Sequence, residues 1–193
     1  MAKEQAIQVE GVIKETLPNT IILAISAISI AIILGIILGI LSALNKNTFL
    51  DIAIQFFSTI GMSVPSFFSA IIFAWIFGFL LKDFTGLEMS GSLYELDDYG
   101  ESFHLKLKNL ILPSVVLGIR PLAVISQLMR NELLNILNQD YIRTAKAKGL
   151  SKFYVIKNHA IKNSLNPVVT AISGWFASLL AGAVFVEFIF GWN

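Results

Sequence analysis

The sequence contains no cysteine and little charge, and each shortage excludes a class of function. Without cysteine the chain can form no disulfide, no thiolate metal site and no cysteine nucleophile. Only 14% of its 193 residues are charged, whereas about a quarter are charged in an average soluble domain. The net charge is +1, so no strong overall field would attract nucleic acid. We therefore expect neither a water-soluble fold nor a nucleic-acid partner.

Several enzyme motifs are also missing from the sequence. No Gly-x-x-x-x-Gly-Lys phosphate loop occurs, so this chain is not expected to bind ATP in the usual way. Neither Gly-x-Ser-x-Gly nor His-Glu-x-x-His is present, which leaves an intramembrane hydrolase without support. The two histidines, His104 and His159, have no ligand-type neighbours at metal-binding spacing. We expect no enzyme activity and no cofactor or metal in this chain.

Long apolar stretches dominate what is present. Hydrophobic residues make up 55% of the chain, and the mean hydropathy is +0.74. A helix needs about 20 apolar residues to cross the hydrocarbon core of a bilayer. Four stretches satisfy this requirement: residues 20–44, 52–81, 109–129 and about 167–190. The sequence therefore predicts an all-α, polytopic membrane helix bundle.

Proline, asparagine and glycine predict where these helices start and break. Pro-Asn at residues 18–19 and Asn-Pro at 166–167 predict the starts of the first and fourth spans. Gly61 and Pro65 mark a break in the long second stretch, which is either one tilted or broken helix or a helix with an interfacial lead-in. In the first span every fourth residue is small, from Ala27 to Ala43. Such a face favours close helix packing within the chain, with a subunit interface as the alternative.

The distribution of basic residues predicts the topology. Seven bases and two acids lie between Arg130 and Lys162, whereas residues 82–108 contain six acids and three bases. Because basic loops stay in the cytoplasm, residues 130–164 and the turn around Lys46 should be cytoplasmic, and residues 82–108 extracytoplasmic. This topology would place residues 1–18 outside, so we expect a further span ahead of them.

Residues 130–164, here called the basic segment, show helical patterning. Leu133, Leu137, Tyr141 and Ala145 are spaced by four and predict one helix from the third span to Gly149, a natural C-terminal cap. Ser151 can cap a second helix to about residue 164. The apolar face of that helix would be formed by Phe153, Ile156, Ala160 and Ile161. Such a helix-turn-helix could dock on a protein or lie on anionic lipid, and periodicity favours neither.

Residues 140–151 (DYIRTAKAKGLS) and 159–167 (HAIKNSLNP) resemble the cytoplasmic coupling loop of ABC importer permeases, in the variant of dipeptide, oligopeptide and nickel systems. In the wider superfamily this loop begins Glu-Ala-Ala, followed by three residues and Gly. Here Arg143, Thr144, Ala145 and Gly149 stand at those positions, with arginine replacing the acid. The stretches SVPSF (63–67), ILP (111–113) and GAVFVE (182–187) are also similar to the family.

The resemblance implies the permease subunit of an ATP-driven importer for peptides or related small solutes, in the plasma or inner membrane. Residues 1–193 would be one permease domain that lacks the first and last of the family's six spans. The implied partners are cytoplasmic ATPase subunits carrying ATP and Mg, a second related permease subunit, an extracytoplasmic solute-binding protein and the lipid bilayer.

The resemblance further implies roles for individual residues. Closure of an ATPase dimer would be coupled to alternating access by Arg143, Thr144, Ala145, Gly149, Leu150, Ser151, Phe153, Tyr154 and Ile156. Of these, residues 153, 154 and 156 would form an apolar protrusion seated in the ATPase.

Pro65, Arg120 and Glu187 are candidates for the pore or gate. Arg120 lies mid-span and should face protein, water or an acid, in a pore-lining or a structural role. Glu187 could act at the gate or at the binding-protein surface, or only reach the interface, and Pro65 could kink a helix or contact solute.

Two other classes of protein remain as alternatives. A secondary transporter or channel fragment would need acidic residues mid-span, and none precedes Glu187. The sequence does not exclude the second alternative, a membrane scaffold that transports nothing.

Overall fold

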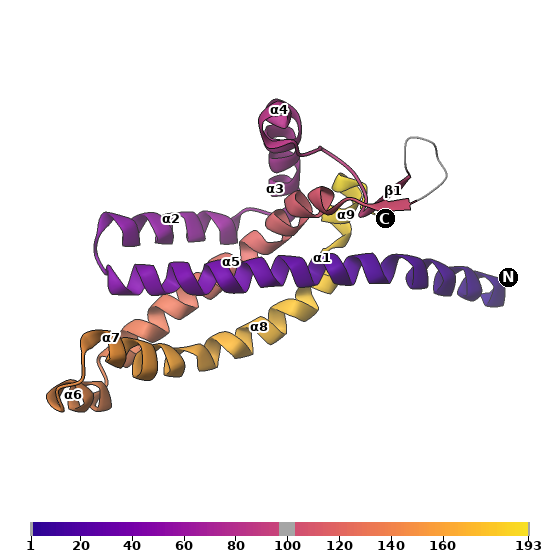
Figure 1. Cartoon of the computed structure of the whole chain (residues 1–193). Helices are drawn as coiled ribbons and strands as arrows, with labels where there is room; N and C mark the ends of the chain where they lie inside the picture. The colour runs from indigo at the N-terminus through magenta and orange to yellow at the C-terminus, as the bar shows by residue number, and fades with distance from the viewer. Residues whose placement is uncertain (1, 97–102, 193) are drawn as a thin grey trace. The chain divides into compact units, whose positions relative to one another are not determined.

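The computed structural model describes residues 2–96 and 103–192 and is helical apart from one small sheet (Figure 1). The chain forms two compact units. One consists of Met1–Ala27, Pro65–Leu117 and Ala177–Asn193, and the other of Ile28–Val64 and Gly118–Phe176. Part of the acidic loop, residues 97–102, lies outside the described residues.

Two helices are long and apolar enough to cross a membrane, and there are up to four such spans if each interrupted pair is counted as one. The two are residues Thr16–Leu44 of α1 (Ala2–Leu44) and all of α5 (Leu107–Leu137). The interrupted pairs are α2 (Phe49–Ser63) with residues Ser66–Leu80, and Lys152–Leu180 with α9 (Val184–Phe190). These segments confirm the predicted polytopic helical membrane fold.

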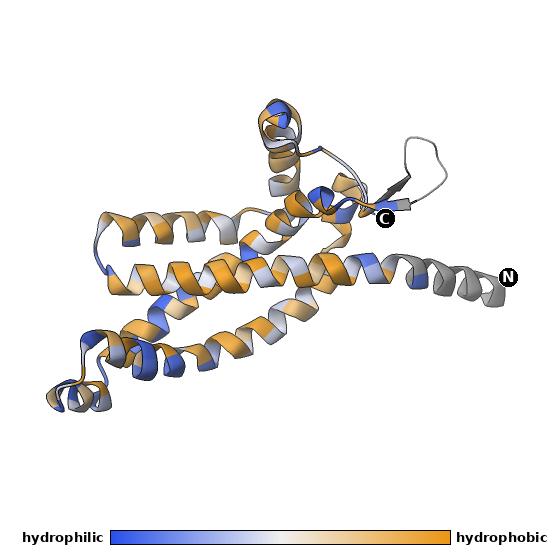
Figure 2. Cartoon of the chain, in the orientation of Figure 1, coloured by the Kyte–Doolittle hydropathy of each residue, from blue (hydrophilic) through white to orange (hydrophobic). Residues whose placement is uncertain are grey.

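In the second unit, residues 28–44 of α1, α2, residues 118–137 of α5 and residues 162–176 of α8 (Lys162–Gly182) form a helix bundle. Its fully buried core includes Ala31, Ile125, Met129, Leu133 and Val168. In Figure 2 the helices of this bundle are mainly hydrophobic, and the hydrophilic residues gather at α6 (Asp140–Ala147) and α7 (Lys152–Val155).

The small face of α1 packs inside this bundle, as predicted. Ala31, Gly35, Gly39 and Ala43 are all buried. A Cβ at position 39 would lie 2.6 Å from the Ser126 carbonyl oxygen of α5. Glycine is thus required because the two backbones approach too closely for a side chain.

The predicted break lies at residues 64–65, where the first unit resumes along the chain. Pro65 ends α2 and caps α3 (Ser66–Phe73), with extended backbone at both Val64 and Pro65. The chain continues through the π-helical η1 (Ala74–Leu80), α4 (Lys82–Thr85), and the antiparallel strands β1 (Tyr94–Leu96) and β2 (Phe103–Leu105). α9 packs on α3, where the Phe67 and Phe185 rings are 6.5 Å apart.

Three predicted helix boundaries were wrong. α1 does not start at residues 18–19 but includes Pro18 in its interior. The helix of the third span does not continue to Gly149. It ends at Leu137, where Asn138 Nδ2 donates to the Leu134 carbonyl at 3.0 Å. The second helix does not stop near residue 164. It runs from α7 through the π-helical η2 (Ile156–Ile161) into α8, with Pro167 inside.

We expect Gly39→Ala to destabilise the chain by about 1–3 kcal/mol, because the new methyl group overlaps the α5 backbone. Gly174→Ala is the matched control, since a Cβ there meets nothing within 4 Å in a helix of the same unit. Thermal unfolding in detergent should show a lower midpoint for Gly39→Ala only. Equal midpoints would contradict the close packing.

Candidate functional site

The basic segment folds as a short helix, a tight turn and a second helix. α6 buries Ile142 and Ala145 against the bundle and exposes Arg143 and Thr144. Tyr141, predicted on the buried face, is instead 42% exposed. Its hydroxyl accepts a hydrogen bond from Asn163 Nδ2 at 3.0 Å, which ties α6 to the first turn of α8.

The turn after α6 requires a glycine. Gly149 has φ +81°, a left-handed conformation that costs other residues about 1–2 kcal/mol. A Cβ at this position would meet nothing within 4 Å, so the backbone conformation and not space explains the glycine. Leu150 is partly exposed, and the Ser151 hydroxyl accepts from Tyr154 N at 3.3 Å, which confirms the predicted helix cap.

The helix that follows has three distinct faces. Val155 and Ala160 are fully buried in the core. Phe153 points outward and is 73% exposed, with Lys157 Nζ 5.8 Å from its ring centroid, and Tyr154 is 48% exposed. Ile156, predicted as part of the same protrusion, is only partly exposed and lines a separate groove. The structure therefore brings Phe153 and Tyr154 together on the surface without Ile156.

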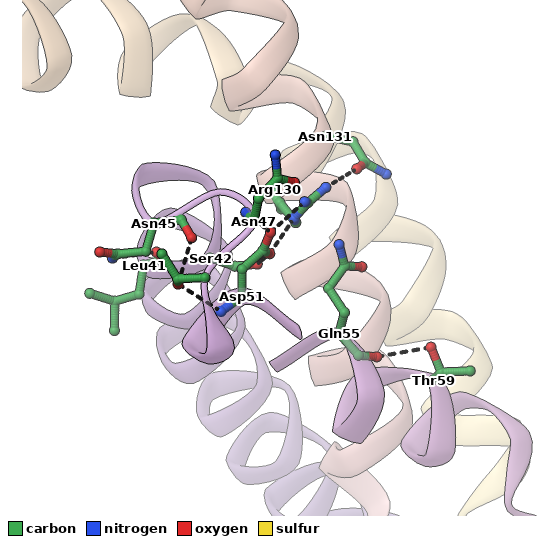
Figure 3. A network of polar contacts seen from close by, with 10 residues as sticks. Leu41, Ser42, Asn45, Asn47, Asp51, Gln55, Thr59, Arg130 and Asn131 are labelled. Atoms are coloured by element: carbon green, nitrogen blue, oxygen red, sulfur yellow. Dashed lines mark hydrogen bonds and ion pairs between the residues drawn. The ribbon is translucent and has the colours of Figure 1, made fainter. Parts of the chain in front are cut away.

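A buried ion pair holds the base of this segment. Arg130 of α5 contacts Asp51 of α2 through two bonds, Nε to Oδ1 at 2.7 Å and Nη2 to Oδ2 at 2.8 Å (Figure 3). Their side chains are only 14% and 4% exposed. Ser42 Oγ donates to the same carboxylate, as does Asn47 N at 2.9 Å. Every oxygen of the carboxylate is thus hydrogen-bonded.

Local sequence places Asp51 for this role. α1 ends in a turn in which Asn47 has φ +64°, a conformation that asparagine tolerates. Thr48 then caps α2 by accepting from Asp51 N at 3.4 Å. Gln55, one helical turn after Asp51, accepts from Arg130 Nε at 2.8 Å when its amide oxygen faces the guanidinium. The α1–α2 turn is therefore fixed to Arg130 of α5, the first residue of the basic segment.

This ion pair was missed in the sequence. Arg130 counted only as one basic residue of the segment, and Asp51, just ahead of the predicted second span, received no role. The one available signal was an acid in the first turn of α2 after a capping threonine.

The pore candidates lie in both units. Arg120 is exposed on α5, with its guanidinium carbon 5.9 Å from the Trp175 ring centroid of α8 in the same unit. Pro65 and Glu187 belong to the other unit, on the neighbouring elements α3 and α9. Glu187 Oε1 is buried, and it finds no hydrogen-bond partner in the part of the chain that the structure describes.

Among residues 2–96 and 103–192, no three His, Cys, Asp or Glu side chains lie close enough together to hold a metal ion.

Comparison with known proteins decides the family. Residues 31–193 match the family of binding-protein-dependent transport system inner membrane components. The chain belongs to this family. The match covers α2, the basic segment and α9, and so includes both the ion pair and the exposed phenylalanine.

Curated relatives within the family are peptide permeases. The chain is 35% identical over 188 residues to the dipeptide transport system permease protein DppB of Bacillus subtilis, which covers 97% of this chain and 56% of that protein. It is 37% identical over 201 residues to the di/tripeptide transport system permease protein DppB of Pseudomonas aeruginosa, covering 95% and 59%. The chain thus spans a little over half the length of these relatives.

We expect Asp51→Ala to destabilise this permease-family chain by about 3–5 kcal/mol, because Arg130 would stay buried without its partner. The matched control is Asp140→Ala. It breaks the exposed ion pair of Asp140 with Arg143, whose side chains are 95% and 73% exposed, and should change stability little. Thermal unfolding in detergent measures both. If both variants unfolded at the same temperature as the parent chain, the Asp51–Arg130 pair would not stabilise the fold as inferred.

Proposed function

We propose that this chain is the permease subunit of an ATP-driven importer for peptides or related small solutes. Family membership and the relatives' names support the class of transporter. The observation that carries the mechanism is the exposed pair Phe153 and Tyr154 at the start of a helix that continues without interruption into α8. An ATPase dimer on the cytoplasmic side would supply ATP and Mg.

The proposed coupling is mechanical. A displacement of Phe153 by the ATPase would be transmitted to residues 162–176 of α8, because α7, η2 and α8 form one continuous helical path. Val155 and Ala160 anchor this path in the core, and the Asp51–Arg130 pair holds the α1–α2 turn to α5. Coupling requires contacts that differ between two global states, so ATPase closure must change the contacts of Phe153 and Tyr154.

The other residues of the site take supporting roles in this proposal. Gly149 and Ser151 set the direction of the protrusion, Leu150 extends its apolar surface, and Arg143 and Thr144 face the partner from α6. Ala145 packs α6 on the core. Ile156 is removed from the protrusion because it faces the groove.

Arg120 and Glu187 are proposed for the solute path. The guanidinium of Arg120 lies beside Trp175 and remains exposed, so it can meet a carboxylate or a carbonyl of the solute. Glu187 carries a buried carboxylate oxygen without a partner in the described chain, which suits a gate that binds a donor transiently. Pro65 provides the fixed break between α2 and α3.

We expect Phe153→Ala to reduce retention of the ATPase subunit roughly tenfold on purification, because an aromatic anchor is lost from the centre of the interface. Phe84→Ala is the control, since Phe84 is 91% exposed but lies in the predicted extracytoplasmic loop. Thermal unfolding should be unchanged in both, as both rings are exposed. Undiminished ATPase retention by a folded Phe153→Ala chain would refute the protrusion.

The absence of cysteine makes the proposed topology directly testable. In intact cells a membrane-impermeant maleimide should not label Lys148→Cys in the basic segment, but should label Phe84→Cys. After permeabilisation both should react, since both positions are exposed. Labelling of Lys148→Cys from outside would show that the basic segment is extracytoplasmic. A cytoplasmic ATPase could then not bind it.

A further inference from the structure

A groove of about 380 Å³ lies beside α7, and Phe153 is not among its lining residues. Three lysines line it, each from a different element: Lys46 from the α1–α2 turn, Lys146 from α6 and Lys152 from the start of α7. Its apolar wall includes Leu44, Leu137 and Ile156. The groove is therefore basic along one part and apolar along another.

Within residues 2–96 and 103–192, no ion pair compensates these three positive charges. The Arg130–Asp51, Arg143–Asp140 and Lys82–Glu88 pairs include no lysine of the groove. Three like charges around one groove repel each other. An anion bound between them would relieve this repulsion.

The apolar wall indicates the depth of the groove in a membrane. Leu44 ends the candidate span Thr16–Leu44, and Leu137 ends α5. With 29 and 31 residues, these helices are about 43 and 46 Å long at a rise of 1.5 Å per residue. A bilayer with its head groups is about 40–45 Å thick, so both leucines come to lie at the level of the head groups.

We propose that this groove binds the head group of an anionic phospholipid. The phosphodiester would lie among Lys46, Lys146 and Lys152, and the first carbons of the acyl chains would lie on Leu44, Leu137 and Ile156. Basic pockets between helices on the cytoplasmic side are suited to such head groups. The site requires membrane insertion but does not depend on transport of peptide.

This lipid surface is separate from the proposed ATPase surface. Lys152 and Ile156 are four residues apart and share the helix face that lines the groove. Phe153 and Lys157 share the next face, as the contact between them shows. One short helix can therefore contact lipid and a protein partner with different residues.

The test compares two triple variants of equal charge. Lys46→Gln/Lys146→Gln/Lys152→Gln removes the lysines of the groove, and Lys148→Gln/Lys157→Gln/Lys162→Gln removes three exposed lysines outside it. Native mass spectrometry measures binding of phosphatidylglycerol and phosphatidylcholine to the chain, purified with the proteins that it assembles with. We expect phosphatidylglycerol affinity to fall roughly tenfold or more in the groove variant only, and phosphatidylcholine binding to be equal in all.

Several outcomes would overturn the proposal. Equal loss of phosphatidylglycerol in both triple variants would show a general charge effect, and no loss in either would show that the groove holds no lipid. Displacement of the lipid by millimolar inorganic phosphate would indicate a site for free phosphate. If the groove variant lost the ATPase subunit but still bound phosphatidylglycerol, the groove would be a contact for the ATPase and not for lipid. The single variant Lys46→Gln, which leaves the basic segment intact, should show an intermediate loss and serves if the triple variant does not fold.

Discussion

The buried pairing of Asp51 with Arg130 is the constraint on which the α1–α2 turn and the basic segment of this permease-family chain depend. A buried ion pair is favourable only when its remaining hydrogen bonds are satisfied. Here they are, because Ser42 and the Asn47 amide complete the carboxylate and Gln55 can complete the guanidinium. The pair is bidentate, so it fixes the orientation of α2 against α5 as well as their distance. The α1–α2 turn and the start of the basic segment consequently form one rigid base.

On this base the exposed residues of the basic segment are divided between two proposed contacts. α6 and α7 bury a few small or branched side chains, and this burial sets the direction of every exposed residue. Phe153 and Tyr154 face a proposed ATPase, whereas Lys152 and Ile156 face the proposed lipid site. Because neighbouring residues of one helix serve different contacts, a substitution in this segment is informative only when the face that it alters is known.

Short-range patterns in the sequence predicted much of this arrangement. The left-handed turn at Gly149, the cap at Ser151 and the break at Pro65 all depend on residues within a few positions, and all three were predicted. The ion pair could not be predicted, because Asp51 and Arg130 are 79 positions apart and neither stands out among the charges beside the predicted spans. The end of α5 was also missed, since it depends on competition by one asparagine side chain for a backbone carbonyl.

The continuity of α7, η2 and α8 was hardest to predict, because Asn166 and Pro167 form a typical helix start. Proline inside a helix leaves the carbonyl four residues earlier without its donor. Here Asn163 is held by another contact, since its side chain bonds Tyr141, and Ser164 Oγ bonds the Ala160 and Ile161 carbonyls in the π-helical turn. These side-chain contacts hold the helix on the N-terminal side of the proline. The path from Phe153 to α8 is continuous where the sequence alone would place a break, as the proposed mechanical coupling requires.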